Sequence, residues 1–127
     1  MRKRLLEEPD GRFYIGTSTF PRAGKGLFAK VSLAKGVRVE VLGVLVRANS
    51  VSDRCTHYAD AYKFRLGRHL LIPLGYGAFV DHSVHPNLKK VVEGARVYLQ
   101  TLRRIKKGEE LCFRYSTYAQ RRFRLNA

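Results

Sequence analysis

The sequence predicts a mainly β domain with little helix, and three observations support that prediction. Short segments alternate apolar and polar residues, which is the two-residue period of a half-buried strand. Glycines separate these segments where turns between strands are required. At 127 residues the chain has the length of one domain, so we expect a single domain over residues 1–127.

Each expected element has a local reason. Strands are expected over residues 37–46, 63–66, 70–72, 95–102 and 110–115. The first is rich in β-branched residues, with Gly43 as a bulge or bend, and the fourth alternates over its whole length. Lys106-Lys107-Gly108 is typical of a turn between two strands. Ser50 is suited to cap one or two helical turns that end near Tyr58.

Composition and cysteine content narrow the class of protein. Apolar residues make up 45% of the chain, which argues against disorder, and no apolar run reaches the roughly 20 residues of a membrane span. The basic N-terminal segment lacks the apolar core of a secretory signal. Cys55 and Cys112 form neither a disulfide framework nor a zinc site, and Cys112 is interpreted as a small buried thiol. We therefore expect no metal, no membrane contact and an intracellular protein, either cytoplasmic or associated with a nucleoid or chromatin.

The net charge of +15 comes from 25 Lys and Arg against 10 Asp and Glu. Such a charge creates a long-range positive field. It serves either solubility or contact with nucleic acid, because Lys and Arg neutralise phosphates and release counterions. The densest basic segments are Arg103 to Lys107 and the short tail 116–127.

Three motifs stand out along the chain. They are Gly24-Lys25-Gly26-Leu27-Phe28-Ala29, Asp81-His82-Ser83-Val84-His85-Pro86-Asn87, and Gly108-Glu109-Glu110-Leu111 with Tyr115 four residues later. Together with Tyr62-Lys63-Phe64 they resemble the signature of the SET-domain protein-lysine methyltransferases. The resemblance covers residues 24–115 and points to the small, stand-alone type of that family.

The resemblance implies a SET-like fold of small curled sheets with a C-terminal pseudoknot. It also implies an S-adenosylmethionine-dependent protein-lysine N-methyltransferase, with S-adenosylhomocysteine as the product and a lysine-bearing protein as the substrate. Methyl transfer of this kind is an in-line displacement that needs alignment and exclusion of water. Some small SET proteins work as homodimers, so the resemblance also suggests a homodimer.

The resemblance assigns site residues position by position. Tyr115 matches the active-site tyrosine that orients the lysine nitrogen, and Tyr62 falls where the lysine channel is lined. Gly24, Lys25 and Gly26 match the loop that holds the methionine end of the donor. Neither glycine has a Cβ, so the backbone there can approach a ligand closely.

The rest of the predicted donor site consists of Asp81, His82 and Tyr118, the last as a candidate cover for the adenine. Asp81 departs from the family, which normally has asparagine at this position. An aspartate still accepts hydrogen bonds and attracts an ammonium group, but it repels the donor carboxylate and costs more to desolvate. Adjacent strand residues point to opposite faces, so we expect Glu109 and Glu110 to have turn or salt-bridge roles rather than to form an acid–base pair.

Two alternatives stay open on the sequence. Asp81 also suits a SET-like binding protein without turnover, and the charge suits a basic nucleic-acid-associated module. A charge of +15 would repel a lysine-rich substrate at long range. An acidic patch near the groove, an acidic or neutral substrate, or nucleic acid that bridges enzyme and substrate would each resolve that conflict.

Overall fold

The structure, a computed structural model, describes residues 10–57 and 62–115. Short strands dominate this part of the chain: β1 Phe13–Thr17, β2 Lys25–Ala29, β3 Arg38–Glu40, β4 Gly43–Arg47, β5 Phe64–Leu66, β6 His69–Pro73, β7 Asp81–His82, β8 Leu88–Glu93, β9 Arg96–Thr101 and β10 Cys112–Phe113. The helical elements described are α1, Val51–Cys55, and the 3₁₀ turn Tyr76–Phe79. The predicted mainly β fold with little helix is confirmed. No helix in the described ranges is long and apolar enough to cross a membrane.

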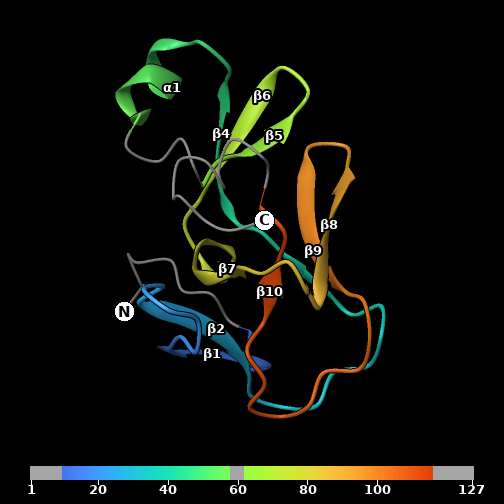
Figure 1. Cartoon of the computed structure of the whole chain (residues 1–127). Coiled ribbons are helices and arrows are strands. Elements are labelled where there is room, and N and C mark those ends of the chain that lie inside the picture. The colour runs from blue at the N-terminus through green and yellow to red at the C-terminus, as the bar shows by residue number, and fades with distance from the viewer. Residues whose placement is uncertain (1–9, 58–61, 116–127) are drawn as a thin grey trace, which may run out of the picture.

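The strands form four small sheets that surround the centre of the molecule (Figure 1). Strands β1 and β2 make an antiparallel pair, and the orders β3-β9-β8 and β4-β6-β5 make two antiparallel three-stranded sheets. The fourth sheet is the parallel pair β7 and β10, in which Cys112 lies opposite Asp81. Parallel neighbours need a long connection, and here that connection contains the whole β8–β9 hairpin.

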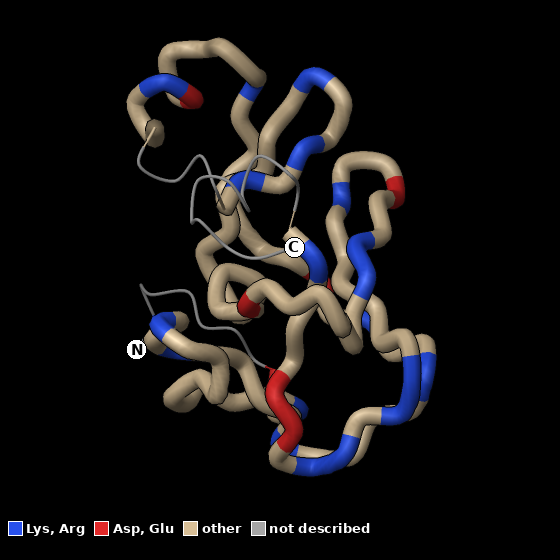
Figure 2. Tube along the Cα trace, viewed as in Figure 1, with Lys and Arg blue, Asp and Glu red and all other residues tan. Residues whose placement is uncertain are grey.

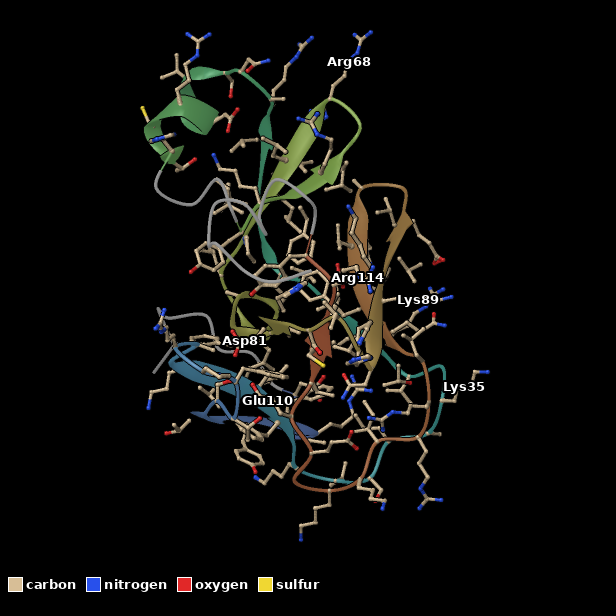
Figure 3. The ribbon with its side chains drawn as sticks, viewed as in Figure 1. Lys35, Arg68, Asp81, Lys89, Glu110 and Arg114 are labelled. Carbon is tan, nitrogen blue, oxygen red and sulfur yellow. The ribbon has the colours of Figure 1, made fainter. Side chains whose placement is uncertain are left out.

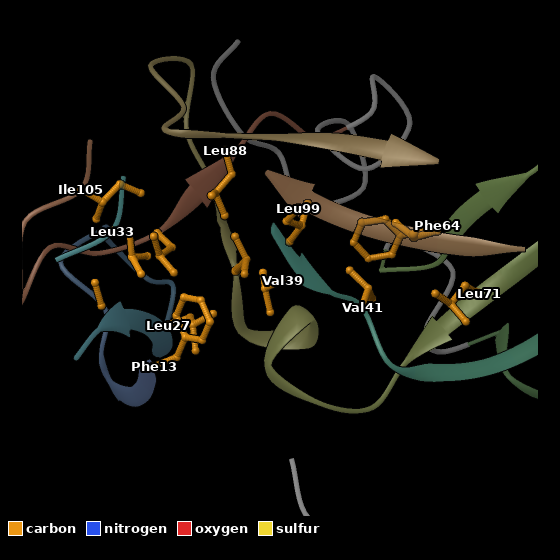
Figure 4. Packing of buried hydrophobic residues seen from close by; sticks show 14 residues of the cluster. Phe13, Leu27, Leu33, Val39, Val41, Phe64, Leu71, Leu88, Leu99 and Ile105 are labelled. Atoms are coloured by element: carbon orange, nitrogen blue, oxygen red, sulfur yellow. The ribbon is translucent and has the colours of Figure 1, made fainter. Parts of the chain in front are cut away.

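One apolar core joins the sheets. Its most deeply buried members are at most 2% exposed and come from β2, β8, β9 and the segments beside them: Leu27, Val80, Leu88, Val97, Leu99, Ile105 and Leu111. Figure 4 shows their side chains converging from several strands. Full burial of one such side chain contributes about 1.5–3 kcal/mol, so this shared core holds the small sheets together. Cys112 is also buried, as predicted.

Local signals predicted some elements well. The strand expected over 95–102 is β9, and Ser50 does cap α1, with its hydroxyl accepting a hydrogen bond from the Asp53 amide at 3.2 Å. The strand expected over 37–46 is instead β3 and β4, which belong to different sheets. The chain changes sheets between them, because Val41 still bonds Val97 of β9 whereas Leu42 already bonds Leu74 beyond β6.

The strand expected over 110–115 is wrong in extent, since only Cys112–Phe113 forms a strand with β7. The residues just before Cys112 pair with a different strand, since Glu110 forms a bridge with Phe28 of β2. Strands β1, β2 and β8 were not expected. Gly16 and Gly26 weaken the strand pattern of β1 and β2, and β8 exposes most of its residues, so that little alternation is visible in its sequence.

Asn87 holds the central crossing of the chain. Its side-chain amide donates to the Glu110 carbonyl at 2.9 Å and accepts from the Cys112 amide at 2.8 Å. On the opposite side of the same segment, the Leu111 amide donates to the Leu27 carbonyl at 2.8 Å. Residues 109–112 therefore lie between β2 and the loop that follows β7, which is the crossing expected of the SET pseudoknot.

We expect Asn87→Ala to lower the free energy of unfolding by about 2–4 kcal/mol, because a buried N–H and a buried C=O would both lose their partner. Chemical denaturation measures the change. Gln100→Ala is the matched control, since that amide bonds only the exposed Arg38 guanidinium among the described residues and should change stability by less than about 0.5 kcal/mol. Equal losses in the two variants would contradict the central role of Asn87.

Candidate active site

A pocket of about 390 Å³ lies between β2, the chain after β6 and the start of β7. It is lined by Ala23, Lys25, Tyr62, Ile72, Pro73, Leu74, Ala78, Phe79 and Asp81. The structure thus brings together three of the predicted site residues, Lys25, Tyr62 and Asp81, from segments up to 56 residues apart in the numbering. The mixed lining offers apolar walls and a single carboxylate, which suits a ligand with an apolar body and a cationic group.

Gly26 lies in β2 rather than in a loop and is buried against two carboxyl groups. A Cβ on Gly26 would collide with the Glu110 carboxylate and would lie 3.2 Å from Asp81 Oδ2. Gly24, just before the strand, has a φ of +70°, which favours glycine. The Gly24-Lys25-Gly26 motif therefore has an internal reason for its glycines, besides the predicted approach of a ligand.

Glu110 is buried, and its carboxylate accepts three hydrogen bonds from the chain between β1 and β2. The Ser18 hydroxyl donates at 2.6 Å, the Thr19 hydroxyl at 2.6 Å and the Thr19 amide at 2.7 Å. The predicted turn or salt-bridge role is correct for Glu109, which pairs with Arg103, and wrong for Glu110. The two glutamates do not converge, but Glu110 lies beside Asp81, a neighbour 29 positions away that no local pattern could identify.

Asp81 stands at the start of β7 with its Oδ2 buried and without a hydrogen-bond partner among residues 10–57 and 62–115. Burial, together with the negative charge of Glu110, raises the pKa of Asp81 to about 7 against the opposing effect of the nearby Ser18 hydroxyl. Figure 3 shows both labelled carboxyl groups close to β2. A carboxyl group with this pKa changes its charge near neutral pH.

Tyr115 is held by contacts at both its backbone and its hydroxyl. Its amide donates to His82 Nδ1 at 3.0 Å, and its hydroxyl donates to the Val80 carbonyl at 3.0 Å. Burial raises the Tyr115 pKa above its ordinary value, and Asp81 and then Tyr62 add to the rise through their charges. The hydroxyl therefore stays protonated at neutral pH and lies within electrostatic reach of both pocket residues. The imidazole of His82 orients Tyr115, a side-chain role that the sequence did not suggest.

Aromatic rings surround Tyr115. Its ring centroid lies 5.2 Å from that of Phe113 and 5.3 Å from that of His82, and Phe113 stacks on Phe64 of β5 at 5.6 Å. This apolar surrounding fits a channel for an alkyl side chain such as that of lysine. Tyr118, the predicted adenine cover, lies outside the described residues.

Lys63, next to Tyr62, forms a buried ion pair that sequence reasoning missed. Its side chain is 1% exposed, and Nζ donates to Asp53 Oδ1 at 2.6 Å and to the Asp53 carbonyl at 2.9 Å. Asp53 also accepts from the Asn49 amide at 2.7 Å. These bonds attach α1 to the start of β5, and they hold the segment that carries Tyr62 at the edge of the pocket.

Comparison with known proteins agrees with this geometry. The model of the SET domain family matches residues 24–116. A relative in Schizosaccharomyces pombe, named histone-lysine N-methyltransferase, H3 lysine-37 specific, is 30% identical over 103 residues, which are 76% of this chain and 69% of that protein.

Solved structures share the fold. A candidate histone methyltransferase of Plasmodium falciparum superposes with a TM-score of 0.66 at 23% identity, over 85% of this chain and 96% of that one. A Polycomb Repressive Complex 2 structure from Chaetomium thermophilum, bound to S-adenosylmethionine, superposes with a TM-score of 0.71 at 21% identity. It covers 87% of this chain but 16% of the larger chain.

We expect Gly26→Ala to cost about 1–3 kcal/mol of stability, because the added methyl group displaces a carboxylate held by three hydrogen bonds. Gly11→Ala is the control, since a Cβ there meets nothing within 4 Å. Thermal denaturation measures both variants, and Gly26→Ala in a Glu110→Ala background completes a double-mutant cycle. The cost of Gly26→Ala should shrink in that background. If the loss of stability caused by Gly26→Ala is as large without the Glu110 carboxylate as with it, the added methyl group does not collide with that carboxylate.

Proposed function

The chain belongs to the SET-domain family, and on that premise we propose that its pocket binds the methyl donor while Tyr115 orients a substrate lysine beside it. The activity is that of an S-adenosylmethionine-dependent protein-lysine N-methyltransferase. The observation that carries the assignment of residues is that Asp81 and Tyr62 line one pocket and that both also act electrostatically on Tyr115.

The residues present fit the donor. Asp81 Oδ2 is a buried acceptor without a partner in the described chain, which suits the donor's ammonium group. Gly26 lets both carboxyl groups approach the backbone of β2, and Lys25 at the pocket edge suits the donor's carboxylate. When bound, S-adenosylmethionine supplies a methyl group on a positively charged sulfur. We propose Gly24, Lys25, Gly26, Asp81 and His82 as the donor site.

Tyr115 acts by position rather than as a base. A protonated phenol that donates to the Val80 carbonyl keeps oxygen lone pairs that can accept a hydrogen bond from a neutral lysine amine. A lysine has a pKa of about 10.4 in water, so the channel must favour its neutral form. The apolar rings of Phe64 and Phe113 disfavour the ammonium ion by desolvation. Tyr62, 43% exposed, lines the entrance to the pocket and narrows the approach.

We expect Tyr115→Phe to fold and to bind S-adenosylhomocysteine as wild type does, and to lose about 100-fold in methyl transfer, because only the orienting hydroxyl is removed. Tyr62→Phe should lose less. Radiolabelled transfer to a lysine-bearing protein or peptide library measures the rate, and calorimetry measures ligand binding. Tyr14→Phe, on the outer pair β1–β2, is the control and should keep full activity. Equal labelling by Tyr115→Phe and wild type would remove Tyr115 from the reaction.

A second proposal concerns the basic surface. Leu33 and Ile105 form a bridge with reciprocal backbone hydrogen bonds of 2.8 Å, which places the loops 30–36 and 102–108 side by side. Figure 2 shows basic residues following both loops, and Figure 3, in the same view, places Asp81 away from them. We propose that this basic edge contacts nucleic acid. Its exposed members include Lys35, Arg104, Lys106 and Lys107.

This arrangement addresses the conflict between a basic enzyme and a basic substrate. The relative acts, by its name, on lysine 37 of histone H3. We propose a nucleic-acid-associated protein as the substrate class, so that phosphates offset the charge of both partners. Association with chromatin or a nucleoid is the location that follows. The homodimer stays a prediction, and the exposed Val44 and Leu45 on edge strand β4 are where we would expect its contact.

The affinity for a mixed-sequence DNA duplex should fall steeply with salt and show little base preference. We expect the triple variant Arg104→Gln, Lys106→Gln, Lys107→Gln to reduce the slope of log affinity against log salt by up to about three. The control variant Arg47→Gln, Arg54→Gln, Arg68→Gln removes the same charge near α1 and the β5–β6 turn, far from the basic edge (Figures 2 and 3). Fluorescence anisotropy across a salt titration provides the measurement. Equal slopes in the two triple variants would locate binding elsewhere.

A further inference from the structure

Two carboxyl groups meet beneath Gly26, and one of them, that of Asp81, also lines the donor pocket. One methyl group placed on Gly26 would touch both the Glu110 carboxylate and, at 3.2 Å, Asp81 Oδ2. Glu110 is 8% exposed, and Asp81 is half-buried with a fully buried Oδ2. Two carboxylates this close in a poorly solvated place cannot both carry full charge, so such pairs hold a shared proton.

The hydrogen bonds show which member of the pair carries the charge. Glu110 accepts from Ser18 once and from Thr19 twice, and such donors stabilise an ionised carboxylate. Asp81 Oδ2 receives no such donor from the described residues. A proton on Asp81 would turn the unpartnered oxygen into a donor toward Glu110. The pKa of Asp81, raised by burial to about 7, agrees with that assignment.

Other polar groups face Asp81 from every element packed against it. Cys112 lies opposite it on β10, and burial raises the pKa of that thiol. Tyr115 comes three residues after Cys112, and burial raises its pKa as well. Lys25 of β2 and Tyr62 line the same pocket as Asp81. His82 is the next residue of β7 and accepts a hydrogen bond through Nδ1 from the Tyr115 amide. Because burial raises the pKa of both Cys112 and Tyr115, neither of these two groups ionises between pH 6 and pH 8.

We propose that Asp81 and Glu110 share one proton in the free enzyme and that the donor's ammonium group displaces this proton when it binds. The proposal rests on the donor site proposed above. The proton passes from Asp81 to solvent, and the ammonium group, which keeps its own protons, takes its place as the positive charge beside two carboxylates. An asparagine at this position could not exchange a proton in this way, so the pair makes donor binding depend on pH in this chain.

The direction of the pH dependence of donor affinity follows from this exchange of a proton for an ammonium group. At pH values below the pKa of Asp81, binding must release a proton, so affinity rises about tenfold for each unit of pH. Above that pKa the carboxylate is already ionised and affinity levels off. Cellular acidification by one unit below neutrality would therefore reduce occupancy of the donor site at a fixed donor concentration.

The test uses the 127-residue chain with S-adenosylhomocysteine, which carries the ammonium group but no sulfonium charge. Calorimetry from pH 5.5 to 8.5 should show affinity that rises about tenfold per pH unit at the acidic end and becomes flat above about pH 7.5. At pH 6, two buffers of different ionisation enthalpy should report about one proton released per ligand bound. A constant affinity over this range, or no proton release at pH 6, would overturn the proposal.

Two variants and one further ligand test whether the released proton comes from Asp81 or from a neighbouring group. Asp81→Asn should bind with no proton release and no dependence on pH, whereas release that persists in this variant would assign the proton to His82. Glu110→Gln should bind more tightly than wild type at pH 6, because Asp81 then ionises at lower pH. 5′-Methylthioadenosine, which lacks the ammonium group, should bind independently of pH. Proton release with this ligand would contradict the exchange.

Failure of the proposed function gives a different result from failure of this inference. No binding of S-adenosylhomocysteine at any pH would reject the donor site itself. Carbon-13 NMR of the carboxyl groups in the free protein tests the pair without any ligand. It should show Asp81 titrating near pH 7. A midpoint below pH 5 would overturn the shared proton even if the donor binds.

Discussion

The rest of the structure depends on the passage of residues 109–112 between β2 and the loop that follows β7. Asn87 satisfies the backbone on one side of this segment, and Leu27 does so on the other. The passage puts Glu110 beneath Gly26 and Cys112 beside Asp81. Three residues after Cys112, Tyr115 then reaches His82 and Val80. A site assembled from distant segments is thus held by backbone hydrogen bonds that form only when the crossing is made.

The carboxyl pair shows how the site departs from ordinary packing. Most buried carboxylates are paired with a cation or satisfied by donors. Glu110 meets that rule through Ser18 and Thr19, whereas Asp81 Oδ2 finds no donor in the part of the chain that the structure describes. A buried carboxyl oxygen that lacks a hydrogen-bond donor and lies beside a pocket is a candidate position for a ligand that supplies the donor. The same feature answers part of the charge problem, since a net charge of +15 still leaves a local negative site for a cationic group.

Charge is also distributed unevenly over the surface. The loops 30–36 and 102–108 carry basic residues along one edge of the molecule (Figure 2). The pocket is lined by residues outside these two loops. The basic edge and the donor pocket are built from separate residues, so the proposed polyanion contact and the proposed site for a cationic group do not compete for side chains.

The sequence by itself determined the fold class, the β9 strand, the Ser50 cap and the order of motifs that identifies the family, because these depend on local periodicity and on residue types at fixed spacing. It also named Lys25, Tyr62 and Asp81, which line one pocket. Only the tertiary structure decided the place of Glu110, the division of residues 37–46 between two sheets and the role of the His82 ring. Each of these rests on hydrogen bonds or close contacts between residues that are distant in sequence, and no local pattern encodes which distant segment will lie alongside.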